Sequence, residues 1–506
     1  MKIEEIRDIL RFINDFFSEE NQFLDIKKLS SENTKTAEFY KILTGTTIQE
    51  DKEAANLIYG TAKPNANFMS LKSQFISRTL NTITHIDLSH PKISHVTKAV
   101  FISYKNLFII SALLRMDRRR AAMPLVRKTL IITEKYELYH VAVELLEQLR
   151  NYALLMGEKT NYEKIVKSLD RNLNLLCSES KVRTLLQRLQ IHSAISIHIK
   201  DELLPQALES VKEIEKELLT NDSYANRMAY FRLQYMYYQY AGSTLDSIAA
   251  CENAIEYMNT KQHLTSPIRI GEFKLRILEN YTIAQDYENG KQAATDCANY
   301  IPADSSPWLQ YKEQYFLLLM VQSKFDEAQI IYDEVLGNIR LRSQLAAIAE
   351  RWEIYKLYLD YGAELDKRRR AYPLRQKRYQ KRMKEYPTYS KDKNGLNVSL
   401  LILNILLLLE GNKIDKIEDQ SEALSTYGYS HLRSKFSSQS SILFKMIRIM
   451  VENDYNYEII IKKTARLERK LAVTKPSRFE IAETVMIFPP MMMWLRMKNA
   501  LKKSKR

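Results

Sequence analysis

Residues 316–337 read FLLLMVQSKFDEAQIIYDEVLG, two helical patterns separated by a short polar break. The first pattern is almost wholly apolar. The second places apolar residues three and four positions apart, which is the spacing of one face of an α-helix. The break, Gln322–Lys324, has the length of a connection between antiparallel helices. The stretch therefore predicts a helical hairpin, and a single hairpin cannot bury its apolar face without neighbours.

The same layout occurs in the unit that precedes this hairpin. Ser266 and Ser306 lie forty residues apart, and each is followed by proline and a helical pattern. Serine suits the N-cap and proline the first helical position. In the earlier unit the break AQD leads into a second helix, YENGKQAATDCANYI. The positions that open successive second helices are spaced by 42, 41, 42 and 38 residues, at Tyr162, Leu204, Leu245, Tyr287 and Phe325.

These units resemble the tetratricopeptide (TPR) repeat. In that family the second helix opens with an aromatic residue, followed by a small residue three places later and a large one four places after that. Phe325, Ala328 and Tyr332 match these positions. The preceding unit matches at four positions, including the first-helix aromatic and the terminal proline, with Tyr281, Tyr287, Gly290 and Pro302.

The TPR resemblance covers more than half of the chain and extends to bacterial proteins that contain such repeats. The period here is longer than the family's 34 residues, and loops or longer helices accommodate the difference. The resemblance implies antiparallel helical hairpins stacked into a solenoid whose concave face binds a partner protein or peptide. It implies neither a cofactor nor an enzymatic activity.

Composition independently favours an all-α fold. The 506 residues include only 11 Gly and 12 Pro, and no long run alternates apolar with polar residues as a half-buried strand does. Scarcity of these residues predicts long helices and few tight turns. We therefore expect an all-α protein, a TPR-like α-solenoid of stacked antiparallel hairpins with an N-terminal helical cap domain.

The length of the chain exceeds what a single hydrophobic core supports. We expect an N-terminal helical domain, TPR-like helical repeats, a basic helix with its connector, and C-terminal hairpins with a basic tail, over residues 1–95, 96–365, 366–393 and 394–506. In the last segment Leu400–Leu424 follows the hairpin plan. An apolar helix leads to a turn at Gly411-Asn412 and to a second helix with one apolar side, formed by Ile414, Ile417, Ser421 and Leu424.

The N-terminal segment predicts three helices, Thr36–Leu43, Glu50–Tyr59 and Asn67–Ile83. On the third, we expect a core face of Phe68, Leu71, Phe75 and Leu80, and an outward row of Ser70, Gln74, Ser77, Arg78 and Asn81. Such a trihelix suits either a cap on the repeats or a helix-turn-helix that reads DNA. Residues 1–90 hold 11 basic and 13 acidic residues. DNA affinity comes largely from Lys and Arg on phosphates, so the cap is favoured.

Motifs that carry chemistry were not found in the sequence. No two glycines stand closer than fifteen residues, which excludes the GxxxxGK[ST] and GxGxxG phosphate loops. HExxH, GxSxG and zinc-spaced Cys/His clusters do not occur. The spacing of His85, His90 and His95 does not place them on one helical face, so loop histidines are favoured over metal ligands. We expect a protein that is not an enzyme and has no cofactor or metal, with an unrecognised active site as the alternative.

The cysteines and the N-terminal residues favour a cytoplasmic location. The three cysteines lie far apart, without the pattern of a disulfide framework, and the acidic N-terminus is unlike a signal peptide. The most apolar run, VSLLILNILLLL at Val398–Leu409, has twelve residues. A membrane span needs about 20, so we expect a buried core helix and no membrane span.

A basic stretch at 367–384, KRRRAYPLRQKRYQKRMK, holds ten Lys or Arg and no acid. Tyr379, Met383 and Tyr386 recur on one helical face, which leaves the bases on the remaining arc. A solvated helix face is one interpretation. The others are binding of an acidic protein surface, of nucleic acid or of anionic lipid. The candidate partner-binding cations are Arg368, Arg369, Arg370, Arg375, Lys377, Arg378, Lys381 and Arg382.

A tyrosine-rich helix, YFRLQYMYYQY at 230–240, offers rigid amphipathic side chains suited to partner contacts. The candidate contacts are Tyr230, Tyr235, Tyr237 and Tyr238. The alternative is that these tyrosines pack between hairpins. Together the patterns predict a non-enzymatic scaffold that binds a protein or peptide partner. The runner-up is a nucleic-acid-associated regulator that uses the N-terminal trihelix or residues 367–384.

Overall fold

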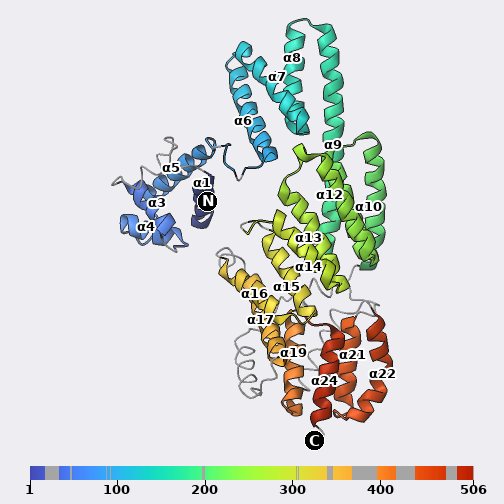
Figure 1. Ribbon diagram of the computed structural model, residues 1–506. Coiled ribbons are helices and arrows are strands. Elements are labelled where there is room, and N and C mark those ends of the chain that lie inside the picture. Colours follow the sequence, from blue (N-terminus) through green and yellow to red (C-terminus); the bar gives the residue numbers. More distant parts are fainter. Residues whose placement is uncertain are drawn as a thin grey trace. The chain divides into compact units, whose positions relative to one another are not determined.

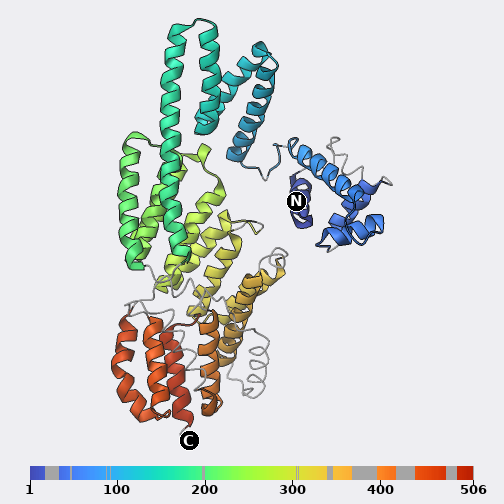
Figure 2. The ribbon, with the colours of Figure 1, turned by 180° about the vertical axis from the view of Figure 1, so that it is seen from behind.

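The computed structural model describes residues 1–16, 34–45, 48–86, 88–91, 93–195, 200–303, 305, 307–338, 346–366, 396–417, 439–474 and 487–504. These residues form twenty α-helices, two short 3-10 helices and no strand (Figures 1 and 2). The all-α prediction is therefore confirmed. The chain divides into two compact units, Met1–Leu173 and Asn174–Arg506. The finer four-segment division remains a prediction.

The first unit contains two groups of helices. The bounds are α1 Ile3–Phe16, α3 Lys35–Gly45, α4 Asp51–Tyr59 and α5 Ala66–Ile83, then α6 His95–Arg115, α7 Arg119–Lys135, α8 Tyr139–Leu155 and the start of α9, Lys159–Ile195. The first group has its own core, in which the ring of Phe39 lies 5.8 Å from that of Phe68 and 5.2 Å from that of Phe75. The helices predicted in this segment are present, with ends shifted by one or two residues.

The expected core face of α5 needs one correction. Phe68, Leu71 and Phe75 are buried, but Leu80 is 45% exposed and Thr79 is buried in its place. Residues 68, 75 and 79 follow the helical period on one face, whereas residue 80 is turned about 100° from residue 79. Thr79 satisfies its hydroxyl inside the helix by donating to the Phe75 carbonyl at 2.7 Å.

The second unit continues with consecutive antiparallel helices. Their bounds are α10 Lys200–Thr220, α11 Tyr224–Ala241, α12 Thr244–Thr260, η1 Gln262–Leu264, α13 Pro267–Ala284, α14 Tyr287–Tyr300, α15 Trp308–Val321, α16 Phe325–Gly337, α17 Ala346–Asp366, α19 Leu396–Glu410, η3 Ile414–Lys416, α21 Gln439–Glu452, α22 Tyr457–Val473 and α24 Pro490–Ser504. From α10 to α17 each helix packs against the next along the chain. The hairpin predicted from residues 316–337 is α15 and α16.

Helix starts agree with the sequence signals in part. Ser266 and Pro267 occupy the N-cap and first helical positions of α13, although the serine side chain makes no capping hydrogen bond. Pro307 is itself the N-cap of α15 rather than its first residue, and Ser306 lies outside the described residues. Asp286, in the AQD break, caps α14 by accepting from the Asn289 N–H at 3.2 Å.

The expected register is regular near Phe325 and weaker upstream. Phe325, Ala328 and Tyr332 are all buried, as their motif positions require. Leu245 opens α12 but is 79% exposed, so it does not pack as Phe325 does. Farther upstream α9 runs unbroken for 37 residues, where the repeat pattern predicts two shorter helices.

One type of turn closes eight of the connections, which corrects the expectation of few tight turns. In each, a residue with positive φ stands one or two places after the helix, and the next N–H donates to the carbonyl five residues back. Examples are Asp286 N to Tyr281 O at 3.0 Å and Lys324 N to Leu319 O at 2.9 Å. This is the Schellman arrangement. The positive-φ residues are Asp117, Glu137, Gly157, Gly242, Gln285, Ser323, Asn412 and Asp454.

Side chains about forty residues apart join alternate helices. Arg232 on α11 pairs with Glu272 on α13 at 2.9 Å. On α15, Glu313 accepts from Arg351 at 3.1 Å and from the Tyr355 hydroxyl at 2.6 Å, both on α17. The separation in sequence equals the length of one hairpin, so the period found in the sequence is also the period of these contacts.

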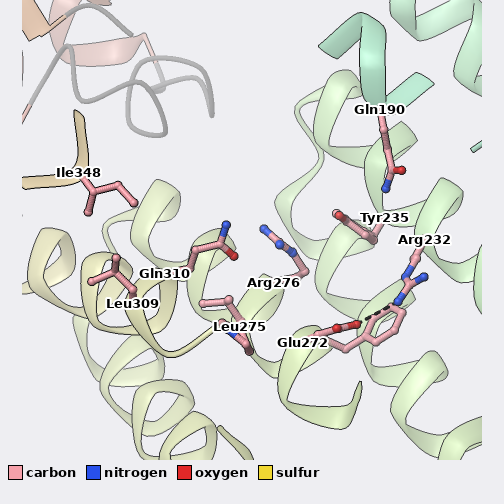
Figure 3. Close-up of a pocket in the computed structure, with 11 residues that line it drawn as sticks. Gln190, Arg232, Tyr235, Glu272, Leu275, Arg276, Leu309, Gln310 and Ile348 are labelled. Atoms are coloured by element: carbon pink, nitrogen blue, oxygen red, sulfur yellow. Dashed lines mark hydrogen bonds and ion pairs between the residues drawn. The ribbon is translucent and has the colours of Figure 1, made fainter. Parts of the chain in front are cut away.

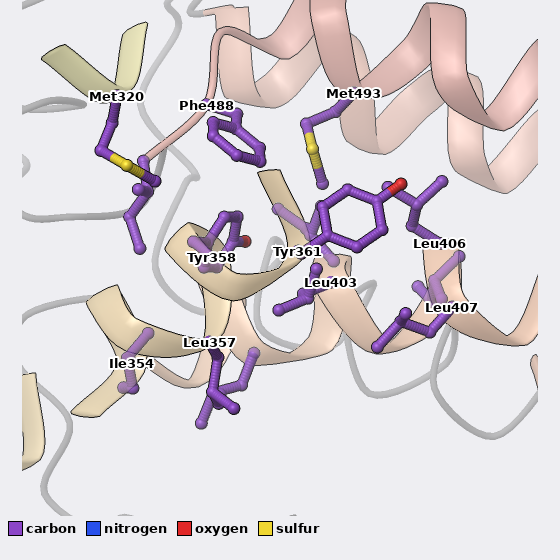
Figure 4. Packing of buried hydrophobic residues seen from close by; sticks show 14 of the residues in the cluster. Met320, Ile354, Leu357, Tyr358, Tyr361, Leu403, Leu406, Leu407, Phe488 and Met493 are labelled. Carbon is purple, nitrogen blue, oxygen red and sulfur yellow. The ribbon is translucent and has the colours of Figure 1, made fainter. Parts of the chain in front are cut away.

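The C-terminal helices enclose a large apolar cluster (Figure 4). The run Val398–Leu409 lies in α19, and its leucines and isoleucines are almost all buried, which confirms the core-helix prediction. Two tyrosines of α17 anchor α19: the Tyr358 hydroxyl donates to the Ser399 carbonyl and that of Tyr361 to Glu410, both at 2.7 Å. The turn at Gly411-Asn412 is present, and the second helix begins as the 3-10 turn η3. Ser421 and Leu424 lie outside the described residues.

Among the described helices, only α6 is long and apolar enough by composition to cross a bilayer. It packs against α7, and Asn106 on α6 donates to the Thr129 hydroxyl on α7 at 3.0 Å. Ile110 of α6 is buried in the cluster that α6, α7 and α8 share. Helix α6 is therefore one member of the helical layer formed by α6, α7 and α8.

Candidate functional site

A pocket of about 590 Å³ lies in the second unit, and alternate helices line it (Figure 3). Its residues come from α9, α11, α13, α15 and α17 and from the residue before α15, and none comes from the intervening helices. They are Gln190, Arg232, Tyr235, Glu272, Phe273, Leu275, Arg276, Pro307, Leu309, Gln310 and Ile348. These alternate helices therefore share one pocket.

Helix α11 contributes Arg232 and Tyr235, which are three residues apart and so lie on one helical face. Arg232 is held by its ion pair with Glu272 across the pocket wall, drawn in Figure 3. Tyr235 is buried and its ring lies edge-on to Phe273 at 6.4 Å. These contacts fix two polar side chains at the rim without leaving a charge unpaired.

Helix α13 supplies the second cation. Arg276 forms an ion pair with buried Glu279. Burial alone would lower the pKa of Arg276, but the Glu279 carboxylate outweighs it and raises that pKa above its ordinary value. Arg276 therefore stays charged at any accessible pH. Its positive charge is balanced locally, so the pocket is not an open anion site.

The remaining wall combines apolar surface with amide groups. Leu275, Leu309 and Ile348 present methyl groups, and in Figure 3 the side-chain amide of Gln310 lies between Arg276 and the pair Leu309 and Ile348. An amide both donates and accepts hydrogen bonds, and so does a peptide backbone. The surface is suited to holding a neutral or zwitterionic chain rather than a polyanion.

The histidines and cysteines are the candidates for metal binding or disulfide formation. Among the described residues, no group of three or more His, Cys, Asp or Glu is placed to hold a metal ion. His85 and His90 lie between α5 and α6, and His95 is the first residue of α6. The three cysteines, in α9, α12 and α14, form no disulfide. What the pocket offers chemically is recognition by paired charges, amides and apolar contacts.

The structure brings one of the four candidate tyrosines into the pocket, namely Tyr235. Tyr230 faces α10 instead, where its hydroxyl donates to Glu215 at 2.9 Å. Tyr237 and Tyr238 are half-buried neighbours with ring centroids 5.3 Å apart. All four tyrosines remain candidate partner contacts, and only Tyr235 lines the pocket.

The candidate cations of the basic stretch lie outside the described residues. These are Arg368, Arg369, Arg370, Arg375, Lys377, Arg378, Lys381 and Arg382. The preceding helix, α17, extends to Asp366. The prediction that this stretch binds a partner therefore stays a prediction.

Sequence reasoning did not single out Arg232, Glu272 and Arg276. A signal exists in α13: Arg269, Glu272 and Arg276 follow the helical period in PIRIGEFKLRILEN and form a polar stripe on a largely apolar helix. Such a stripe is also what an ordinary solvated face looks like. Only the neighbouring helices show that this one borders a hollow.

The N-terminal trihelix has the outward row expected on α5. Ser70, Gln74, Ser77, Arg78 and Asn81 are all exposed. Arg78 is the one cation in this row, and a DNA-reading helix relies on several phosphate contacts. The geometry alone thus permits base contacts, while the charge does not favour them.

Comparison with known proteins concerns the chain as a whole. No protein-family model and no curated protein matches this chain.

Proposed function

We propose that the protein is a binding scaffold that holds a protein or peptide partner in the pocket formed by the first helices of its hairpins. The observation that carries the proposal is that α9, α11, α13, α15 and α17 contribute every lining residue except Pro307, the N-cap of α15. A surface built this way continues from one hairpin to the next, as in the solenoid that the TPR resemblance implies. An extended peptide or a helix fits such a groove.

The charges support a partner segment that is close to neutral. Arg232 and Arg276 are each paired with a carboxylate of α13, Glu272 and Glu279 respectively. A strongly charged ligand must compete with these pairs, whereas amide groups and apolar side chains match Gln310 and the methyl-lined wall directly. A few buried anchors then supply most of the binding energy.

A matched pair of tryptophan substitutions tests this proposal. Gln310→Trp places a large ring in the pocket, and Ile330→Trp places the same ring on the exposed side of α16, in the same hairpin, where Ile330 is 60% exposed. Proteins captured from the native cell by the unaltered chain are identified, and their affinities for both variants measured. We expect Gln310→Trp to weaken binding about tenfold or more and Ile330→Trp to leave it unchanged. Equal affinities for the two variants contradict the assignment.

The basic stretch has its own test within the same capture experiment. The ten bases of 367–384 are replaced by glutamine, and the set of captured proteins is compared with that of the unaltered chain. Loss of acidic proteins alone assigns the stretch to partner binding. An unchanged set shows that it is a solvated face.

The alternative proposal is association with nucleic acid through α5 or residues 367–384. It requires affinity for mixed-sequence DNA or RNA that falls steeply with salt, because binding releases counterions. An electrophoretic shift assay at about 50 mM salt gives the strongest phosphate contacts. Absence of a shift under that condition removes this alternative.

A further inference from the structure

Four large apolar side chains protrude at one end of the layer formed by α6, α7 and α8. Met116 follows α6, while Leu154, Leu155 and Met156 end α8, and these side chains are 74, 68, 63 and 57% exposed. We call these four residues the apolar tip. The outer face of α6 leads toward it with Phe108, which is 75% exposed. Scattered exposed hydrophobic residues need no explanation, but four large ones at two turns of one helical layer indicate an interaction surface.

The two turns that carry the apolar tip lie level with each other. Tyr104 on α6 and His140 on α8 are joined by a hydrogen bond of 2.7 Å. The two helices run in the same direction, because α7 returns the chain between them. Met116 is twelve residues beyond Tyr104, and Leu154 is fourteen beyond His140. At 1.5 Å per residue, both lie about 20 Å from the shared contact, and Figures 1 and 2 show both turns at the same end.

The charges around the apolar tip are mainly positive. Six cations and two anions lie within four residues of it, a net charge of +4, and all but the half-buried Arg150 are exposed. One of the anions, Asp117, pairs with Arg119 at 3.2 Å. The cations are Arg115, Arg118, Arg119, Arg120, Arg150 and Lys159.

We infer that the apolar tip docks on the surface of an anionic lipid bilayer. The four apolar side chains enter the interface, to the depth of about 5–10 Å typical of peripheral segments, while the arginines contact lipid phosphates. A bilayer accepts a protruding, convex tip without a matching cavity, whereas a protein partner needs pockets for such anchors. The positive charge complements the anionic leaflet. This surface is separate from the pocket, so the inference goes beyond the proposed function.

Vesicle co-sedimentation with the full chain tests the inference. The probes are vesicles of phosphatidylcholine alone and of phosphatidylcholine with phosphatidylglycerol. We expect binding to the anionic vesicles, weakened about tenfold in Met116→Ser/Leu155→Ser because burial of apolar side chains drives interfacial binding. The matched control is Leu219→Ser/Leu245→Ser, which removes leucines that are 86 and 79% exposed on α10 and α12. It should bind like the unaltered chain.

A second readout distinguishes binding through the apolar tip from binding through the basic stretch at 367–384. The positive charge of that stretch also suits anionic vesicles. Leu155→Trp should show a blue shift of tryptophan emission on anionic vesicles, after subtraction of the signal of the unaltered chain, and Leu219→Trp should not. No shift at position 155, or equal binding by the two double-serine variants, overturns the inference. Analytical ultracentrifugation showing self-association that Met116→Ser/Leu155→Ser abolishes assigns the tip to a second copy of the chain, and also overturns it.

Discussion

At the scale of single residues, the contact between Phe325 and Gly362 shows how tightly successive hairpins pack. Phe325 opens α16, and its ring lies against the backbone of Gly362 in α17 so closely that a Cβ there would overlap it. The Phe325 ring also meets Phe488 edge-on, at 6.0 Å between centroids. The glycine is therefore required by the aromatic residue 37 positions earlier, rather than by the conformation of its own helix.

Gly362→Ala should destabilise the protein. Overpacking a dense core costs about 1–3 kcal/mol, and the better helix propensity of alanine offsets about 1 kcal/mol of it. We expect a net loss of about 1–2 kcal/mol in the free energy of unfolding, measured by urea denaturation. Gly337→Ala is the control, since nothing lies within 4 Å of the added Cβ there. A loss in the control equal to that of Gly362→Ala would refute the steric explanation.

A pH-dependent loss of stability should arise at Tyr230. Burial, with a further contribution from its hydrogen bond to Glu215, raises its pKa from 10.0 to about 12. The folded protein thus keeps the proton that the unfolded chain releases first. The stabilisation is complete below pH 10.0 and is lost as the pH rises toward about 12. The urea midpoint should fall over this window, and it should fall less steeply in Tyr230→Phe. An identical slope in that variant would count against this assignment.

At the scale of elements, the repeated unit is a helix with its turn. The turn places one residue in the left-handed region and satisfies the last carbonyls of the helix with backbone N–H groups. Only Gly157 and Gly242, of the eight positive-φ residues, are glycines. The others accept a conformation that costs an L-residue roughly 1–2 kcal/mol. The hairpins therefore form despite the turn residues, because the helices on either side bury each other's apolar faces.

Ser323→Gly should stabilise the protein for this reason. Ser323 has φ +58° in the turn between α15 and α16, and glycine adopts that conformation without steric penalty. We expect a gain of about 0.5–1 kcal/mol, reduced by the greater flexibility of the unfolded chain. The reciprocal change, Gly242→Ala, has φ +77° and should lose stability. Thermal unfolding followed by circular dichroism measures both, and a change of the same sign in the two variants would contradict the argument.

The sequence predicted helices better than it predicted turns and the pocket. The starts of α14 and α16 follow from Asp286 and from the polar break before Phe325, which are local signals. The turns do not, because Gln285 and Ser323 are ordinary residues that tertiary packing forces into the left-handed region. The pocket could not be predicted either, since its lining extends from Gln190 to Ile348 and only packing brings these positions together.

At the scale of the whole molecule, the chain forms two compact units with separate apolar clusters. The clusters built on Phe39 and on Leu145 belong to the first unit, and the largest, built on α15–α24, belongs to the second. Each unit therefore has its own source of hydrophobic stabilisation. Cooperative unfolding is expected within a unit rather than across the chain.

Unfolding curves recorded by two probes should therefore differ. All three tryptophans, Trp308, Trp352 and Trp494, lie in the second unit, so their fluorescence reports that unit alone. Far-UV circular dichroism reports the helices of both. We expect urea transitions that do not coincide, which is the signature of a departure from two-state behaviour. Superimposable curves would show that the units unfold together.

The turns between helices have a consequence for how this chain tolerates change. Their hydrogen bonds join main-chain atoms, so almost any side chain can occupy the connection without removing the bond that closes it. Substitutions can accumulate there over generations while the hairpin survives. Relatives of this protein would then keep its fold at low sequence identity.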